Sequence, residues 1–126
     1  MLKRILLVFV LLLLVGCSQD VQENDIFTIT SSGSFSHEDC DDMSLTGKYV
    51  MVESKSCSHC QETLPYFIEA CEEMNRDCII LDVSEQDDFN EMLSYGINVM
   101  YTPTFVLDCN IYVGAMLKDD YVLLMQ

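Results

Sequence analysis

Two cysteines three residues apart, in the segment Cys57-Ser58-His59-Cys60, constrain this chain more than any other feature. The segment follows an apolar, strand-like run over residues 49–52 and opens a helical pattern. Unpaired N–H groups and the dipole at a helix start stabilise a thiolate, so we expect Cys57 to be reactive. Cys60 lies one turn along and can form a disulfide with it. Half-sites for zinc use the same spacing, so the surrounding sequence has to decide between the two chemistries.

The first 16 residues predict an export signal. Lys3 and Arg4 precede an unbroken apolar run of 11 residues, 5–15. Eleven helical residues cover only about 16 Å, whereas the hydrocarbon core of a bilayer is roughly 30 Å thick. A short basic start, a short apolar core and small residues behind it are typical of a signal peptide.

The end of this signal, Leu14-Val15-Gly16-Cys17, resembles the lipobox of bacterial lipoproteins. That resemblance implies that Cys17 is acylated and becomes the mature N-terminus, and several acyl chains give stable anchoring. We therefore expect residues 1–16 to be a lipoprotein signal peptide, 17–25 a lipidated polar tether and 26–126 the folded domain. The expected location is extracytoplasmic, with the lipid anchored to a bacterial membrane. A plain secretory signal that happens to contain a cysteine is the alternative.

The chain is strongly acidic, with a net charge of −15. Without residues 1–16 it loses two basic residues and no acidic one, which brings the net charge to about −17. Such a surface repels nucleic acid and anionic lipid headgroups, so we expect no nucleic-acid partner and a covalent membrane anchor.

Seven cysteines in 126 residues indicate an oxidising compartment. With Cys17 assigned to lipid and Cys57 and Cys60 to one pair, four remain, and they allow three complete pairings. Cys71 and Cys78 flank a turn and are candidates to meet. Free buried thiols are the alternative for all four, which are Cys40, Cys71, Cys78 and Cys109.

The hydrophobic pattern predicts an α/β domain with the element order βαβαβαββα. Strands are expected at 26–30, 49–52, 78–83, 104–107 and 111–113, and helices at 37–45, 58–75, 86–95 and 117–126. The segment 31–36 is expected to be a loop. This order implies a central mixed sheet with helices on both faces.

The chain resembles the thioredoxin family in three sequence features. They are the Cys57–Cys60 motif between strand and helix, Pro65 five residues later inside the helix, and Tyr101-Thr102-Pro103-Thr104 before a core strand. The resemblance covers about residues 26–126 and implies a thioredoxin-like fold with a cis Thr102–Pro103 bond that helps bind an extended substrate. It also implies that Cys57 attacks, that Cys60 resolves, and that the redox-active disulfide is the only cofactor.

Two further residues are candidates for tuning the dithiol. An imidazole at His59 favours the Cys57 thiolate, unless His59 is simply an exposed loop residue. The family often has a buried carboxylate six residues before the first cysteine, where this chain has Met51. Glu53, on the same strand face, is the alternative proton acceptor for Cys60, unless it is solvated. The family's tryptophan before the first cysteine is replaced by Ser56.

The sequence therefore predicts a membrane-anchored, extracytoplasmic thiol–disulfide oxidoreductase. Its expected partners are protein thiols and disulfides, together with a membrane redox partner that recycles the dithiol. A copper- or zinc-handling protein is an alternative, but a second paired ligand cluster is missing, so no metal site is expected. Haem attachment does not fit, because Gln61 follows Cys60 where a histidine is needed. A thioredoxin-like binding module with a structural dithiol is the remaining alternative.

Overall fold

The computed structural model describes residues 25–126. The predicted signal peptide, Cys17 and all but the last residue of the predicted tether lie outside the described residues. Within residues 25–126, no helix combines the length and the apolar character needed to cross a membrane.

The described chain contains seven strands and four helices. The elements are β1 (Phe27–Ile29), β2 (Gly33–Ser34), α2 (His37–Asp42), β3 (Tyr49–Glu53), α3 (Ser58–Glu73), β4 (Cys78–Asp82), α4 (Gln86–Ser94), β5 (Ile97–Val99), β6 (Thr104–Leu107), β7 (Asn110–Val113) and α5 (Lys118–Leu124). All nine expected elements are present within a few residues of their expected bounds. Two short strands were not expected: β2 lies in the segment predicted as a loop, and β5 follows α4.

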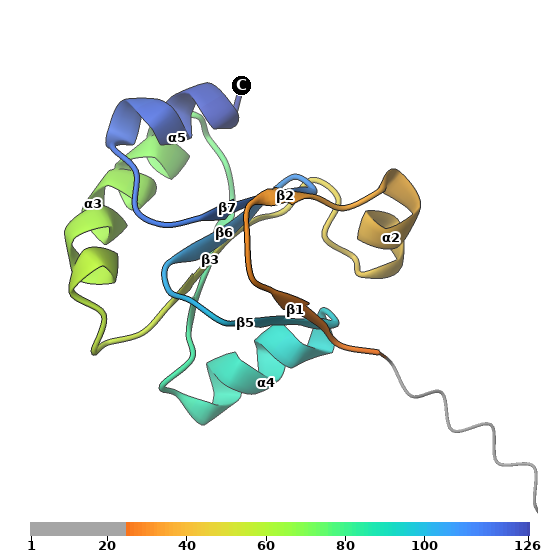
Figure 1. The fold of residues 1–126 in the computed structure, drawn as a ribbon. Coiled ribbons are helices and arrows are strands. Elements are labelled where there is room, and N and C mark those ends of the chain that lie inside the picture. The colour runs from red at the N-terminus through yellow and green to blue at the C-terminus, as the bar shows by residue number, and fades with distance from the viewer. Residues whose placement is uncertain (1–24) are drawn as a thin grey trace, which may run out of the picture.

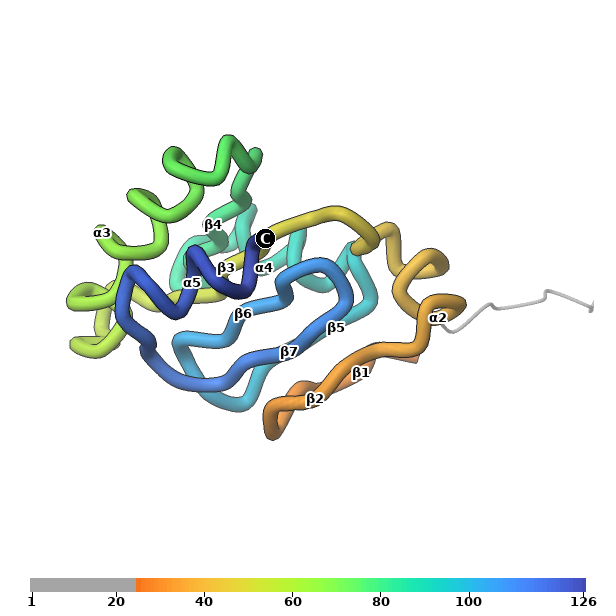
Figure 2. The backbone as a smooth tube through the Cα atoms, turned by 90° about the horizontal axis from the view of Figure 1, so that it is seen from above, coloured from red at the N-terminus to blue at the C-terminus, as the bar shows by residue number. Residues whose placement is uncertain are grey.

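The main sheet is mixed and has the strand order β2-β7-β6-β3-β4, which can be followed from edge to edge in Figure 2. β3 pairs in parallel with β4 and antiparallel with β6. β1 and β5 form a separate parallel pair. Helices α3 and α5 lie on one side of the main sheet, and α2 and α4 on the other (Figure 1). This arrangement confirms the predicted thioredoxin-like α/β fold with helices on both faces.

The central strand β3 is buried on both faces, as its continuous apolar run predicts. Tyr49 and Met51 pack into a core beneath α3 and α5, whereas Val50 and Val52 pack into a second core beneath α2 and α4. This alternation follows from the two-residue period of a strand. Apolar residues at helical spacing along α3 and its C-cap pack in the first of these cores: Cys60, Leu64, Phe67, Cys71 and Met74.

The turn between β6 and β7 is one residue shorter than the gap between the predicted strands at 104–107 and 111–113. Asp108 and Cys109 form a two-residue turn with φ angles of 46° and 71°, and β7 begins at Asn110 rather than at Ile111. Two positive φ angles match the twist that a two-residue hairpin requires. The Asp108 carboxylate accepts a hydrogen bond of 2.8 Å from the backbone N–H of Gly47, which helps hold the turn in place.

Candidate active site

The Cys57–Cys60 pair lies at the start of α3, directly after the carboxyl end of β3. Cys57 is the N-cap residue of α3, and its sulfur accepts a hydrogen bond of 3.1 Å from the backbone N–H of Cys60. A second bond of 3.0 Å, from Cys57 N–H to the carbonyl of Ser54, holds the preceding turn. The two cysteines form a disulfide. Because backbone N–H groups at a helix start favour negative charge, Cys57 is placed where its thiolate is stabilised after reduction.

The two sulfurs differ in access to solvent. Cys57 is half-buried, whereas Cys60 is fully buried beneath α3. A thiol or disulfide of another protein can therefore reach Cys57 and not Cys60. This asymmetry fits the expectation that Cys57 attacks and Cys60 resolves.

The turn before β6 brings a second chain segment to the dithiol. The Thr102–Pro103 peptide bond is cis, as the resemblance implies. The sulfur of Cys57 lies 3.4 Å from the carbonyl oxygen of Thr102, across 45 residues of sequence. The structure thus brings Thr102 and Pro103 beside Cys57.

Two buried carboxylates lie side by side at the carboxyl ends of β3 and β4. Glu53 is 8% exposed and Asp82 is 6% exposed, and the two residues are partners in the parallel register of these strands. One oxygen of each carboxylate, Glu53 Oε2 and Asp82 Oδ2, is buried without a hydrogen-bond partner. Met51, at the position where the family often has its carboxylate, is instead fully buried in the core.

The two carboxyl groups have opposite pKa shifts. Burial raises the pKa of Glu53, and the negative charges of Asp82 and Asp88 raise it further, against the smaller effects of Gln61 and Lys55. Hydrogen bonds from Ser84 lower the pKa of Asp82. Lys55 Nζ lies 3.8 Å from Asp82 Oδ2, which also favours the charged form. Asp82 therefore ionises first, and its charge opposes ionisation of Glu53.

We expect Glu53→Gln to make the protein more stable at neutral pH and to have little effect below about pH 4. In the unfolded chain the pKa of Glu53 lies near its ordinary value of 4.5, and in the folded protein it lies higher. At pH values between these two pKa values, the folded protein binds more protons than the unfolded chain. The free energy of unfolding therefore falls as the pH rises through this range, and it stays lower at higher pH. The glutamine side chain of the variant cannot ionise and avoids this fall.

Urea unfolding of both proteins at pH 4 and pH 7.5 measures this effect. The matched control is Glu91→Gln, which removes one carboxylate from the exposed surface of α4. A stability difference between Glu53→Gln and wild type that is the same at both pH values would contradict the assignment.

His59 lies on the exposed surface of the first turn of α3. Its side chain is 77% exposed, and its Nδ1 lies 3.9 Å from Glu62 Oε2. An ion pair with Glu62 at this distance forms only when the imidazole is protonated. The tuning role of His59 stays a prediction.

A buried polar network, which the sequence did not reveal, ties α3 to α5. The Thr63 hydroxyl donates to the carbonyl of Met116 at 2.7 Å and lies 2.5 Å from the Tyr121 hydroxyl. That hydroxyl in turn accepts a bond of 3.1 Å from Met116 N–H. The segment between β7 and α5 is also linked to the cis-proline turn, because Gly114 N–H donates to the Pro103 carbonyl at 2.9 Å. The network thus fixes the backbone beside the dithiol.

We expect Tyr121→Phe to destabilise the protein by about 1–2 kcal/mol, because it leaves the Met116 N–H without its acceptor and removes one of the two hydrogen bonds of the Thr63 hydroxyl. The ring itself remains, so the packing of Tyr121 against Phe67 and Phe105 is kept. Chemical denaturation measures the loss. Tyr66→Phe is the control, since Tyr66 is 41% exposed. Equal stability of Tyr121→Phe and wild type would contradict the proposed contribution of this network to the free energy of unfolding.

The other four cysteines in the described chain also form disulfides. Cys40 of α2 pairs with Cys109 in the β6–β7 turn, and Cys71 of α3 pairs with Cys78 of β4. The candidate pair Cys71 and Cys78 is therefore correct, and the alternative of free buried thiols is wrong.

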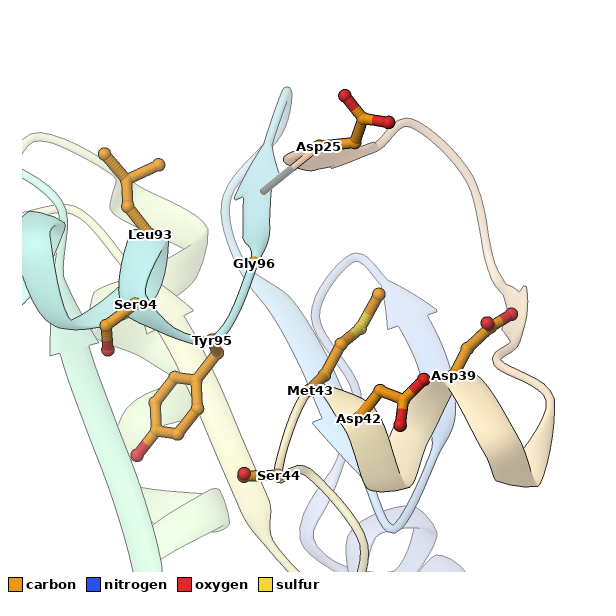
Figure 3. Close-up of a pocket in the computed structure, with 9 residues that line it drawn as sticks. All are labelled: Asp25, Asp39, Asp42, Met43, Ser44, Leu93, Ser94, Tyr95 and Gly96. Atoms are coloured by element: carbon orange, nitrogen blue, oxygen red, sulfur yellow. The ribbon is translucent and has the colours of Figure 1, made fainter. Parts of the chain in front are cut away.

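A cavity of ≈490 Å³ lies away from the dithiol, between α2 and the end of α4. Figure 3 shows the carboxylates of Asp39 and Asp42 on α2, with Asp25 near the start of β1. No residue of α3 or of the cis-proline turn lines this cavity. Within residues 25–126, no group of three or more His, Cys, Asp or Glu side chains has an arrangement suited to a metal ion.

The mixed sheet, the dithiol at a helix N-terminus and the adjacent cis-proline turn define a thioredoxin-like protein. The thioredoxin domain family matches residues 48–123, which is more than half of the chain. The chain therefore belongs to the thioredoxin domain family. Its dithiol is suited to thiol–disulfide redox chemistry in general.

Among solved structures, the chain is similar to an uncharacterized thioredoxin-like protein from Clostridium perfringens, determined in solution. The two share 14% sequence identity with a TM-score of 0.45, over 88% of this chain and 87% of that chain. No curated protein sequence matches the chain.

Proposed function

We propose that this protein is a thiol–disulfide oxidoreductase that exchanges disulfides with protein substrates through Cys57 and Cys60. The observation that carries the proposal is the placement of a half-buried Cys57 at the N-terminus of α3, 3.4 Å from the Thr102 carbonyl. An extended substrate segment beside the cis-proline turn would have its own sulfur next to Cys57.

In the oxidising direction, a substrate thiolate attacks Cys57 Sγ, and the Cys57–Cys60 bond breaks to leave a Cys60 thiolate. A second substrate thiolate then attacks the substrate sulfur of the mixed disulfide and releases Cys57 as a thiolate. The substrate loses two electrons and becomes a disulfide, while the protein gains them as a dithiol. The reducing direction is the reverse, with Cys57 as the attacking thiolate.

We propose that Glu53 takes up the proton of Cys60 when that thiol attacks the mixed disulfide. The support is a buried carboxylate of raised pKa at the end of β3, on the strand face that looks toward α3. If the pH profile of disulfide exchange is the same in Glu53→Gln and wild type, Glu53 has no such role.

A redox titration of the Cys57–Cys60 pair with thiol trapping tests the function, with protein purified both with and without a chelator. A reduction potential well above about −300 mV is expected for a catalytic disulfide, and a lower value indicates a structural bridge. A potential that changes with the chelator would favour metal handling instead.

We propose further that the domain is held outside the cytoplasm by lipid on Cys17, after removal of residues 1–16, and that a membrane redox partner recycles the dithiol. The support is the basic and apolar start of the sequence and its Leu14-Val15-Gly16-Cys17 segment. Incorporation of labelled palmitate and membrane fractionation test the anchor. Palmitate incorporation and membrane association are both expected to be lost in Cys17→Ala. A protein that binds the membrane without carrying lipid would contradict the proposed anchor.

A further inference from the structure

A small cavity of ≈270 Å³ lies between the first turns of α3 and the segment that leads into α5. Its apolar part is formed by Tyr66, Ala115, Met116 and Leu117. Tyr66 is 41% exposed and Leu117 is 67% exposed, so apolar surface at its rim is open to solvent. Cavities that bind cofactors or small molecules usually measure about 300–1,000 Å³, so this one suits a single amino-acid side chain better.

The charge of the cavity is negative. Glu62 and Asp120 belong to its lining, which includes no Lys, Arg or His of the described residues. The nearby Lys118 does not neutralise them, because its Nζ is paired with Glu73 at 3.1 Å. A side chain with a long apolar stem and a cationic end is complementary to such a site.

The walls of the cavity are held rigidly. Thr63 lies in its lining and is hydrogen-bonded to the Met116 carbonyl at 2.7 Å, within the buried network with Tyr121. The Asp120 carboxylate accepts a bond of 3.2 Å from Leu117 N–H, which fixes the start of α5. A preformed site of this kind loses little conformational freedom when it binds.

The cavity is within reach of a substrate held at the dithiol. Along α3, Glu62 follows the reacting Cys57 by five residues and Tyr66 by nine, which corresponds to about 7.5–13.5 Å along the helix axis. An extended peptide advances about 3.3 Å per residue. A substrate residue two to four positions from the reacting cysteine therefore reaches the cavity. The Gly114–Pro103 hydrogen bond of 2.9 Å connects the cavity's far wall to the cis-proline turn.

We propose that this cavity is a specificity site for a Lys or Arg side chain of the substrate protein, two to four residues from its reacting cysteine. The stem packs on Tyr66 and Leu117, and the charged end binds Glu62 and Asp120. The inference rests on the proposed function and adds a substrate class to it.

Rates of mixed-disulfide formation with short single-cysteine peptides test the proposal. Lys, norleucine or Glu is placed in turn at each of the four positions on either side of the cysteine. Each rate is divided by the rate of the same peptide with oxidised glutathione, because a nearby charge changes the reactivity of the peptide's own thiol. At one position within the two-to-four-residue range we expect Lys to react about tenfold faster than Glu and about threefold faster than norleucine.

The preference is expected to fall to within about twofold in the double variant Glu62→Gln/Asp120→Asn and to weaken at high salt. The amide introduced by Asp120→Asn keeps an oxygen to accept the Leu117 N–H bond. Glu62→Gln alone, which changes an exposed residue, provides a second variant that leaves α5 intact. Glu91→Gln on α4 removes one charge away from the cavity and is expected to keep the full preference.

A Lys preference that is equal at all positions, or that persists in the double variant, would reflect the overall negative charge and would overturn the specificity site. In that case exchange with a small dithiol such as dithiothreitol still proceeds, and the proposed function stands. Absence of exchange with both dithiothreitol and the peptides would overturn the proposed function and the site together.

Discussion

Cys57→Ser is expected to lower the rate of disulfide exchange by at least about a hundredfold, because it removes the sulfur that substrates can reach. Cys60→Ser is expected to stop turnover in a different way. Its Cys57 still reacts with substrate, but no buried thiolate is present to resolve the product, so mixed disulfides accumulate. Non-reducing gels with mass spectrometry measure the trapped species, and oxidation of a dithiol peptide measures turnover.

The matched control for both variants is the pair Cys71→Ala/Cys78→Ala. It removes a second disulfide from the same helix, 11 residues beyond Cys60, and leaves the dithiol and the cis-proline turn unchanged. Exchange is expected to continue in this control. Accumulation of mixed disulfides in Cys57→Ser but not in Cys60→Ser would reverse the assigned order of attack.

The elements that the sequence predicted well are those whose pattern is long or strongly periodic. The 16-residue helix α3 repeats apolar residues at helical spacing, and β3 is a continuous apolar run. The strands β2 and β5 have only two and three residues, too few to carry a period. They form because β2 meets β7 and β5 meets β1, and those pairings depend on the tertiary fold.

The residues at the site were predictable where a short motif names them, as for Cys57, Cys60 and Pro103. The closeness of Asp82 to Glu53 could have been predicted from the sequence. Each residue is the last one of its strand, these two strands are parallel, and the carboxyl ends of neighbouring parallel strands lie together. The contact between Thr63 and Tyr121 joins residues 58 apart. No local pattern marks such a pair, so only the folded structure reveals it.

The pairing of Cys40 with Cys109 was equally hidden, since these residues are 69 apart in the sequence. Both are buried in the core beneath α2 and α4, where Leu45 and Ile111 also pack. The disulfide joins α2 to the β6–β7 turn across this core. In the unfolded chain it closes a long loop, whereas Cys71–Cys78 joins residues only 7 apart.

We therefore expect Cys40→Ala/Cys109→Ala to lower the free energy of unfolding by about 4 kcal/mol and Cys71→Ala/Cys78→Ala by about 2 kcal/mol. The chain-entropy account of disulfides gives both values, because a longer closed loop removes more conformations from the unfolded state. A loss of about 4 kcal/mol is a large part of the roughly 5–15 kcal/mol typical of a domain.

Urea unfolding at one pH compares the two double variants, and each leaves no unpaired cysteine in the described chain. A steeper dependence on urea is expected for both variants, most for Cys40→Ala/Cys109→Ala, because the unfolded chain expands when its long loop is opened. A larger loss of stability in the Cys71→Ala/Cys78→Ala variant would mean that contacts in the folded state, such as those around α3, outweigh loop closure. Equal losses would contradict the chain-entropy account for this protein.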